Sequence, residues 1–154
     1  METITIHIYQ DDVYEEVAKA TDYTGAKLMG GDGEARDRIL AADDDLAELS
    51  RFWEESVLAT NENMKEMLVS GRTTTAEGKR GYEAVLAVSK SFDKMLTRSV
   101  ESTLRSFFIA SIIGQWFKFA NKGEAQDYFT QAADMMETAE RLLYSRRKPT
   151  RPTD

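Results

Sequence analysis

His7 is the only histidine of this 154-residue chain, and the chain has no cysteine. The lack of cysteine excludes disulfides, thiol catalysis and zinc or iron–sulfur sites held by thiolates. A catalytic triad or a metal site around one histidine needs help from carboxylates. Because His7 falls on the polar face of a predicted strand, it is typical of an ordinary surface or interface histidine.

The acidic clusters do not have the spacing of a metal site. Asp43–Asp45 are consecutive and point in different directions on a helix, where they are explained by helix capping and the helix dipole. Asp32, Glu34 and Asp37 in the glycine-rich loop are the next candidate for a cation site, although the chain lacks the residue spacing of a calcium loop. Gly30–Gly33 lacks the lysine of a phosphate-binding loop and does not follow a hydrophobic strand. We therefore predict no catalytic, cofactor-binding or metal-binding residues, and no enzyme activity.

Length and composition are those of one globular domain, with 42% hydrophobic and 31% charged residues. The first residues lack the basic start and apolar run of a signal peptide. The most apolar stretch, 107–120, contains Ser111, Gln115 and Lys118 and is too short and too polar to span a bilayer. We expect a cytosolic protein without a membrane partner.

Charge is distributed unevenly along the chain. Residues 1–70 hold 17 acidic and 6 basic side chains, whereas residues 71–154 hold 10 acidic and 14 basic ones, within a net charge of −7. The acidic half disfavours nucleic acid as a partner, and the opposite signs permit head-to-tail association of identical copies. Charge that serves only solubility is the alternative.

Residues 3–9 alternate strictly, with Ile4, Ile6 and Ile8 on one face, which predicts a half-buried strand. Residues 82–88 fit either a strand or a helix, and we favour a strand that pairs with 3–9. A lone strand would leave a row of backbone groups unpaired. If 82–88 is helical, the partner of the first strand must be a neighbouring subunit.

Between these strands, the pattern predicts helices and loops. The aspartates at 11–12 begin a short helix, and Gly25 with the glycines at 30–33 mark loops or breaks. A second short helix covers 34–41. The first long helix opens at 43–45 and stops at Gly71, and 72–80 forms an exposed, mobile loop.

A second long helix is predicted from about Asp93 to Ala120. Its polar, solvent-facing side has Arg98, Glu101 and Arg105. The same side continues with apolar residues, so from Ser106 onward the helix is apolar on nearly all sides. Such a helix must be buried on all sides. It is either a central core helix or it continues into a contact between subunits. The interface candidates on it are Ile109, Ile112, Trp116 and Phe119.

The last helix follows Asn121–Glu124, which has the spacing of a capping box. Prolines at 149 and 152 then oppose helix, so we predict a single domain over 1–145 and a basic extended tail over 146–154. The tail adds the interface candidates Arg146, Arg147, Lys148 and Arg151. The predicted fold class is mainly α, a bundle of about four to five helices with a two-stranded β element near 3–9 and 82–88.

The chain resembles a group of small proteins encoded in the virion-structure modules of phages and prophages of Bacteroides-like bacteria. The likeness lies in 11–19, 106–110 and 146–152, and in the spacing from Trp116 through 121–122 to the last helix. It implies a head–tail connector, a ring component that joins the capsid portal to the tail. Such connectors are mostly helical, with small β elements or extended arms that augment neighbouring subunits, and no catalytic residues are implied.

The expected function is therefore non-enzymatic. The chain is expected to form a homo-oligomer such as a ring and to bind other virion proteins, in the bacterial cytoplasm and then in the virion. A small cytosolic adaptor or regulator that binds its partner as a monomer or dimer is the alternative.

Overall fold

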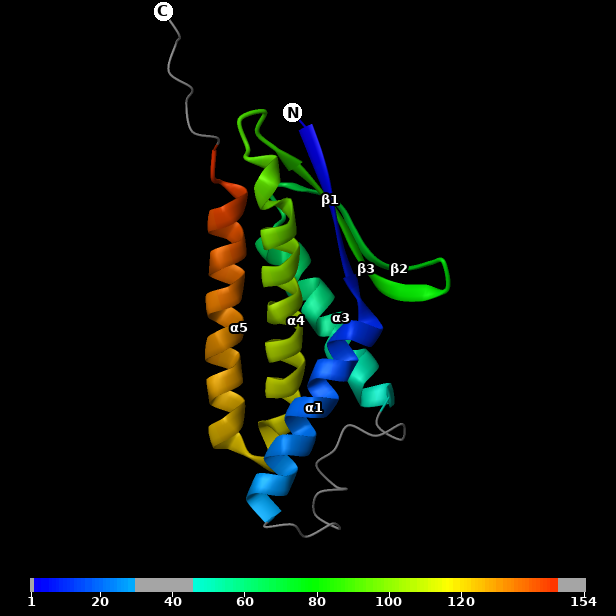
Figure 1. The fold of residues 1–154 in the computed structure, drawn as a ribbon, viewed down its shortest axis with the longest axis vertical. Helices are drawn as coiled ribbons and strands as arrows, with labels where there is room; N and C mark the ends of the chain where they lie inside the picture. Colours follow the sequence, from blue (N-terminus) through cyan, green and yellow to red (C-terminus); the bar gives the residue numbers. More distant parts are fainter. Residues whose placement is uncertain (1, 30–45, 147–154) are drawn as a thin grey trace, which may run out of the picture.

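The computed structural model describes residues 2–29 and 46–146. Within them the protein is mainly helical, with four α-helices and one three-stranded antiparallel sheet (Figure 1). In chain order the elements are β1 (Glu2–Tyr9), α1 (Gln10–Met29), α3 (Leu46–Asn63), β2 (Leu68–Ala76), β3 (Lys79–Val88), the short 3-10 helix η2 (Lys94–Leu96), α4 (Thr97–Ala120) and α5 (Lys122–Leu143).

The sheet has the strand order β1-β3-β2, so the N-terminal strand forms one edge. β1 pairs antiparallel with β3 from Glu2 opposite Val88 to Tyr9 opposite Gly81. The predicted pairing of these two segments is confirmed, and residues 82–88 are a strand. One face of the pair is buried, with Ile4, Ile6 and Ile8 on β1, because apolar alternation places every second side chain against the helices.

The predicted two-stranded β element is wrong, because residues 68–76 form a third strand. The first long helix ends at Asn63 instead of Gly71, and the segment predicted as a loop, 72–80, belongs to a hairpin with a two-residue turn at 77–78. Gly71 lies where β2 closely approaches the side chains of two other segments, and it does not end a helix. A β-carbon there would lie 2.3 Å from Oδ1 of Asn61 and 2.7 Å from the hydroxyl of Tyr82.

The first helix, α1, is longer than predicted and passes through Gly25, where a break was expected. Glycine inside a helix costs only about 1 kcal/mol relative to alanine, so packing along the helix can offset it. Val13 and Val17 are fully buried on α1. The short helix predicted at 34–41 and the helix start predicted at 43–45 lie outside the described residues.

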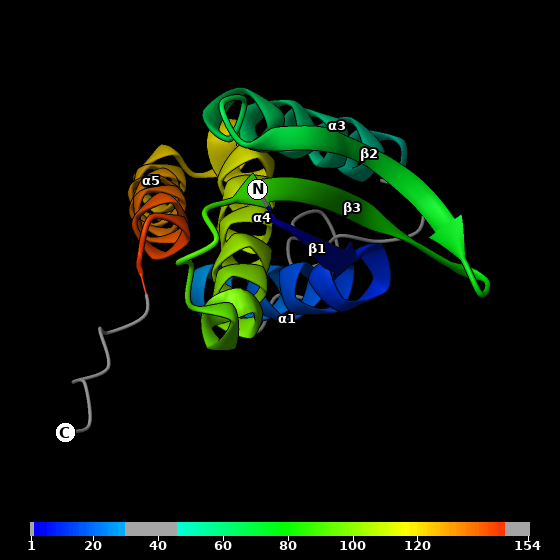
Figure 2. The ribbon, with the colours of Figure 1, turned by 90° about the horizontal axis from the view of Figure 1, so that it is seen from above.

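Helix α4 lies at the centre of the molecule. Figure 2 shows it between the sheet and α5, with α1 and α3 on its two flanks. Its side chains Leu104, Phe108 and Ile112 are fully buried. Phe108 contacts the ring of Trp53 from α3 at 4.9 Å and the ring of Tyr82 from β3 at 5.4 Å between centroids. This aromatic cluster joins three elements at one point in the core.

The start of α5 has one of the two bonds of a capping box, and the backbone N–H of Asn121 donates to the carbonyl of Phe117 instead of to the Glu124 side chain. The side chain of Asn121 accepts a hydrogen bond from the backbone N–H of Glu124 at 3.3 Å. The buried residues of α5 fall on one stripe: Ala125, Ala132, Met136, Ala139 and Leu143. None of the helices in the described ranges is both long and apolar enough to cross a membrane.

The packing of α5 on α4 generates a stability prediction. A β-carbon at Gly114 of α4 would lie 2.8 Å from the ring of Phe129 on α5, so Gly114→Ala must displace this ring or move the two helices apart. We expect this substitution to lower the free energy of unfolding by about 1–3 kcal/mol in urea denaturation.

Gly123→Ala is the matched control for this prediction, since a β-carbon there comes no closer than 3.6 Å to Oδ1 of Asn121. We expect its effect to stay within ~1 kcal/mol. Equal effects of the two substitutions would contradict the close contact between α4 and α5.

Candidate protein-binding surfaces

The structure separates the interface candidates predicted on α4. Ile112 is 0% exposed and belongs to the core, so it offers no surface to another chain in this fold. Ile109 and Trp116 are partly buried and pack against the core cluster. The side chain of Phe119 lies outside the described part of the chain.

Ile109 lines a cleft between α1 and α4, of about 430 Å³, together with Arg105 and the three carboxylates Asp12, Glu15 and Glu16. Helix α1 runs beside α4 at this position. It therefore covers the face of α4 with Ile109, for which the sequence pattern alone indicated no covering element. Ile109 therefore remains accessible only at the bottom of a charged cleft, and it is not part of a broad apolar strip.

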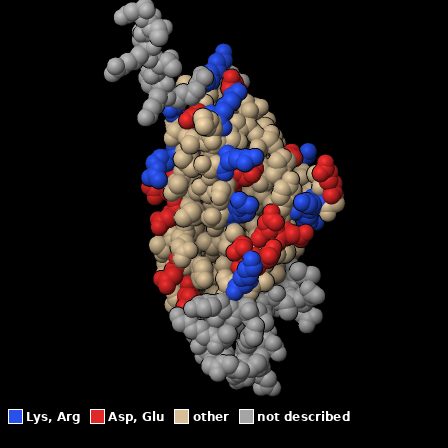
Figure 3. All heavy atoms as spheres, viewed as in Figure 1, with Lys and Arg blue, Asp and Glu red and all other residues tan. Residues whose placement is uncertain are grey.

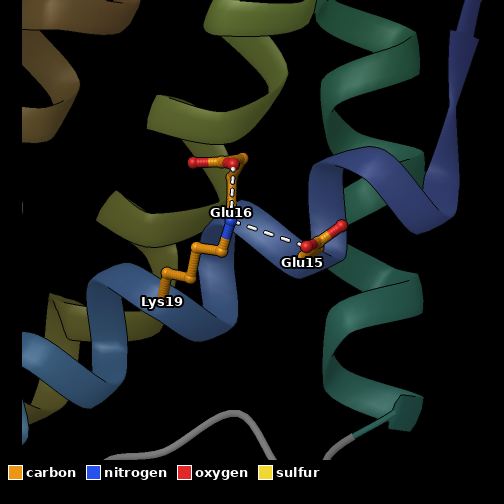
Figure 4. A network of polar contacts seen from close by, with 3 residues as sticks. All are labelled: Glu15, Glu16 and Lys19. Atoms are coloured by element: carbon orange, nitrogen blue, oxygen red, sulfur yellow. Dashed lines mark hydrogen bonds and ion pairs between the residues drawn. The ribbon is translucent and has the colours of Figure 1, made fainter.

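The carboxylates of this cleft belong to the ordinary solvated face of α1. Figure 4 shows Glu15 and Glu16 joined to the ammonium of Lys19, with N–O distances of 3.5 and 3.4 Å. The hydrogen bond to Glu16 and the charges of both glutamates raise the pKa of Lys19. Pairs this exposed contribute little to stability. In the described residues no group of three or more His, Asp or Glu side chains is placed to hold a metal ion.

Arg146 is the one tail candidate within the described residues. It is exposed, and it forms an isolated antiparallel bridge with Phe92, just before η2. Arg147, Lys148 and Arg151 lie outside the described residues.

Sequence reasoning missed the β2–β3 hairpin, which projects beyond the helices (Figure 1). Residues 75–80 at its tip are all exposed, and they include Glu77, Lys79 and Arg80. The ammonium of Lys79 lies 5.4 Å from the centroid of the Tyr9 ring on β1. The strand signal was weak because β2 is polar and threonine-rich, without apolar alternation.

The base of the hairpin is held by polar groups of α3. Asn61 donates a hydrogen bond to the carbonyl of Gly71 at 2.9 Å and accepts one from the Tyr82 hydroxyl at 2.5 Å. Trp53 donates its indole N–H to the Thr73 hydroxyl at 3.0 Å. These hydrogen bonds hold the base of the β2–β3 hairpin against α3. Among the described residues, no side chain of α3 makes such a bond to the hairpin tip, 75–80.

The outer face of the sheet is polar. Its threonines on β1, Thr3 and Thr5, are exposed. Across the three strands, His7, Glu83 and Arg72 stand in one row, because His7 and Arg72 both pair with Glu83. Nδ1 of His7 lies 3.8 Å from Oε2 of Glu83, an ion pair once the imidazole is protonated.

The two edges of the sheet differ. At the β1 edge, the backbone N–H of His7 donates to the carboxylate of Glu101 on α4 at 2.9 Å. Along β2, residues that hydrogen-bond to β3 alternate with residues that do not, and Ala76–Lys79 is the hydrogen-bonded pair that closes the hairpin. Counted from this pair, Gly71, Thr73 and Thr75 turn their backbone N–H and C=O groups away from β3, toward the open edge. The carbonyl of Gly71, which lies nearest the body, already accepts a hydrogen bond from the Asn61 side chain.

Charge of both signs is mixed on the face of the body that Figure 3 shows, where Lys and Arg side chains are interspersed with Asp and Glu. On this face, only local groups of one sign are present for another chain to recognise.

Comparison with known proteins gives no relative: no family model, no curated protein and no solved structure matches the chain.

The anchor of the hairpin generates a pH-dependent prediction. Burial raises the pKa of Tyr82 above its usual value. Because the folded-state pKa lies above the unfolded value of about 10, this phenol contributes stability below pH ~10 that is lost as the pH rises further. Tyr82→Phe also leaves Oδ1 of Asn61 without its donor. We expect a loss of about 1–3 kcal/mol at pH 8, and a smaller further loss than wild type between pH 9 and 11.

Urea unfolding at each pH measures both effects. Burial also raises the pKa of Tyr14, so part of the alkaline loss remains in the variant. Tyr144→Phe, at a 63% exposed position, is the control and should behave as wild type. Equal alkaline slopes for wild type and Tyr82→Phe would contradict the prediction.

Proposed function

We propose that the protein is a non-enzymatic subunit of a protein assembly, and specifically a head–tail connector of a phage or prophage that forms a ring through contacts between copies. The observation that supports this most is the β2–β3 hairpin, whose base is anchored and whose tip is exposed beyond the body.

The hairpin tip contributes little to the core. All residues of 75–80 are exposed, so the tip buries little surface to stabilise the fold. A two-stranded ribbon is at best marginally stable alone in water. An arm of this kind gains buried surface when it contacts another chain, and its main-chain edge offers directional hydrogen bonds for that contact.

The distribution of functional groups supports assembly through unlike surfaces. A ring uses two different surfaces of each subunit repeatedly, head to tail. The hairpin tip has two cations, Lys79 and Arg80, beside the carboxylate of Glu77. The cleft beside α1 has three carboxylates, Asp12, Glu15 and Glu16, beside the single cation Arg105, and Lys19 pairs with two of these carboxylates. Contacts between such groups specify orientation and depend on ionic strength. The proposed location is the host cytoplasm, followed by the virion.

Light scattering at several protein and salt concentrations tests the proposal. We expect a discrete oligomer of many copies whose mass falls as salt rises. Lys79→Glu at the hairpin tip should raise the concentration for half-assembly by about tenfold or more, because reversing one charge in a complementary contact costs over ~1.4 kcal/mol.

Lys122→Glu, an exposed residue at the start of α5, is the control with the same change of charge. A chain that stays monomeric or dimeric at every concentration contradicts the ring. That result favours instead a small adaptor or regulator that binds one partner.

A further inference from the structure

A groove runs between α4 and α5 near the end of α3, with a volume of about 320 Å³. Its floor consists of the buried side chains Phe107, Ala132 and Met136. Two carboxylates of α5, Glu137 and Glu140, form its rim. An apolar floor with a few charged groups at the edge is the usual composition of a binding site, and this volume is at the small end of the range.

The two rim carboxylates are available to an outside cation. Glu137 is exposed and Glu140 partly exposed. Among the described residues, neither Glu137 nor Glu140 forms an ion pair with a Lys, Arg or His side chain. In Figure 3, carboxylates lie along the edge of the molecule formed by α5. A ligand for this groove should therefore be cationic, with aliphatic or aromatic groups for the floor.

We propose that the groove binds the basic C-terminal segment, residues 146–152, of a neighbouring copy of the chain. This deepens the proposed function and rests on it, because it names one contact of the ring. The segment carries four cations in seven residues: Arg146, Arg147, Lys148 and Arg151.

The chemistry of the segment fits both parts of the groove. Arginine and lysine place their charge on carboxylates while their aliphatic stems pack on apolar surface, here on Phe107 and Met136. Pro149 and Pro152 reduce the conformational freedom that the segment loses on binding.

The occupant is the segment of a neighbour because of how the chain leaves α5. Arg146 pairs antiparallel with Phe92, so the backbone at this point runs beside the loop that precedes η2. Arg146 itself does not line the groove. A segment that starts away from its own groove can enter the groove of the next copy, and repeated use of such a contact generates a ring.

Individual contacts of this type are weak, because exposed ion pairs contribute only about 0.2–1 kcal/mol each. Ring closure raises the effective concentration of each segment near the next groove. The contact is therefore expected to be tightest in the closed oligomer, to form between two copies at higher protein concentration, and to be lost when either side loses its charge.

Two full-length variants test the proposal by complementation. The groove variant is Glu137→Lys with Glu140→Lys, and the segment variant replaces all four cations of 146–152 by Gln. Each variant alone should lose the assembled species in light scattering. Mixed at equal concentrations, well above the concentration at which wild type assembles, they should form a dimer of twice the 17.4 kDa chain mass, because each pair has one intact groove and one intact segment.

Asp127→Lys with Asp134→Lys is the matched control. It makes the same change of charge at two exposed positions of α5 that do not line the groove, and it should assemble as wild type. Circular dichroism spectra equal to wild type show that each variant keeps its fold.

The outcomes separate this contact from the ring itself. If wild type assembles and both variants still assemble, the segment does not bind the groove, and the ring uses other surfaces. If both variants are monomeric and their mixture stays monomeric, the proposed contact is also overturned. A wild type that never assembles overturns the ring together with this contact.

Discussion

The need to bury α4 on nearly every side determines the arrangement of the other elements. From Ser106 onward this helix has almost no polar face, and its residues Phe108, Ile112 and Phe117 are fully buried. A helix of this kind cannot remain at a surface, since each exposed side would leave apolar area in water. The sheet, α1 and α3 cover one part of it and α5 covers the rest. Strands β1 and β3 and helix α5 each bury only one face, because one face is all that packs against the core.

Regular apolar patterns made part of the fold predictable. The isoleucines of β1 and the stripe of α5 carry a single period and were located correctly. β2 has no such pattern because its inward positions, Gly71 and Thr73, contact α3 through hydrogen bonds and close backbone approach. Those interactions depend on residues distant in sequence, so hydropathy along the strand does not contain them.

The candidate surfaces were less predictable, because periodicity shows which residues share a face but not which element covers that face. One face of α4 does continue from Arg98 to the apolar residues Ile109, Ile112 and Trp116, as the period predicts. Helix α1 nevertheless packs beside this face. The residues of α1 at the Ile109 cleft are Asp12, Glu15 and Glu16, near the start of that helix. The hairpin was missed for a different reason: its projection depends on the anchoring of its base, which no local signal records.

The Glu101 carboxylate on the N–H of His7 has a consequence for how the sheet can grow. A strand approaching β1 must first displace a charged acceptor from the middle of that edge, whereas β2 still turns the backbone groups of Thr73 and Thr75 outward. The sheet is therefore extensible in one direction only. Two copies that paired edge to edge through β2 would consume both open edges, and the combined sheet would end there. Extension into a fibril, which needs two open edges on every unit, is opposed at the β1 edge by the Glu101 carboxylate.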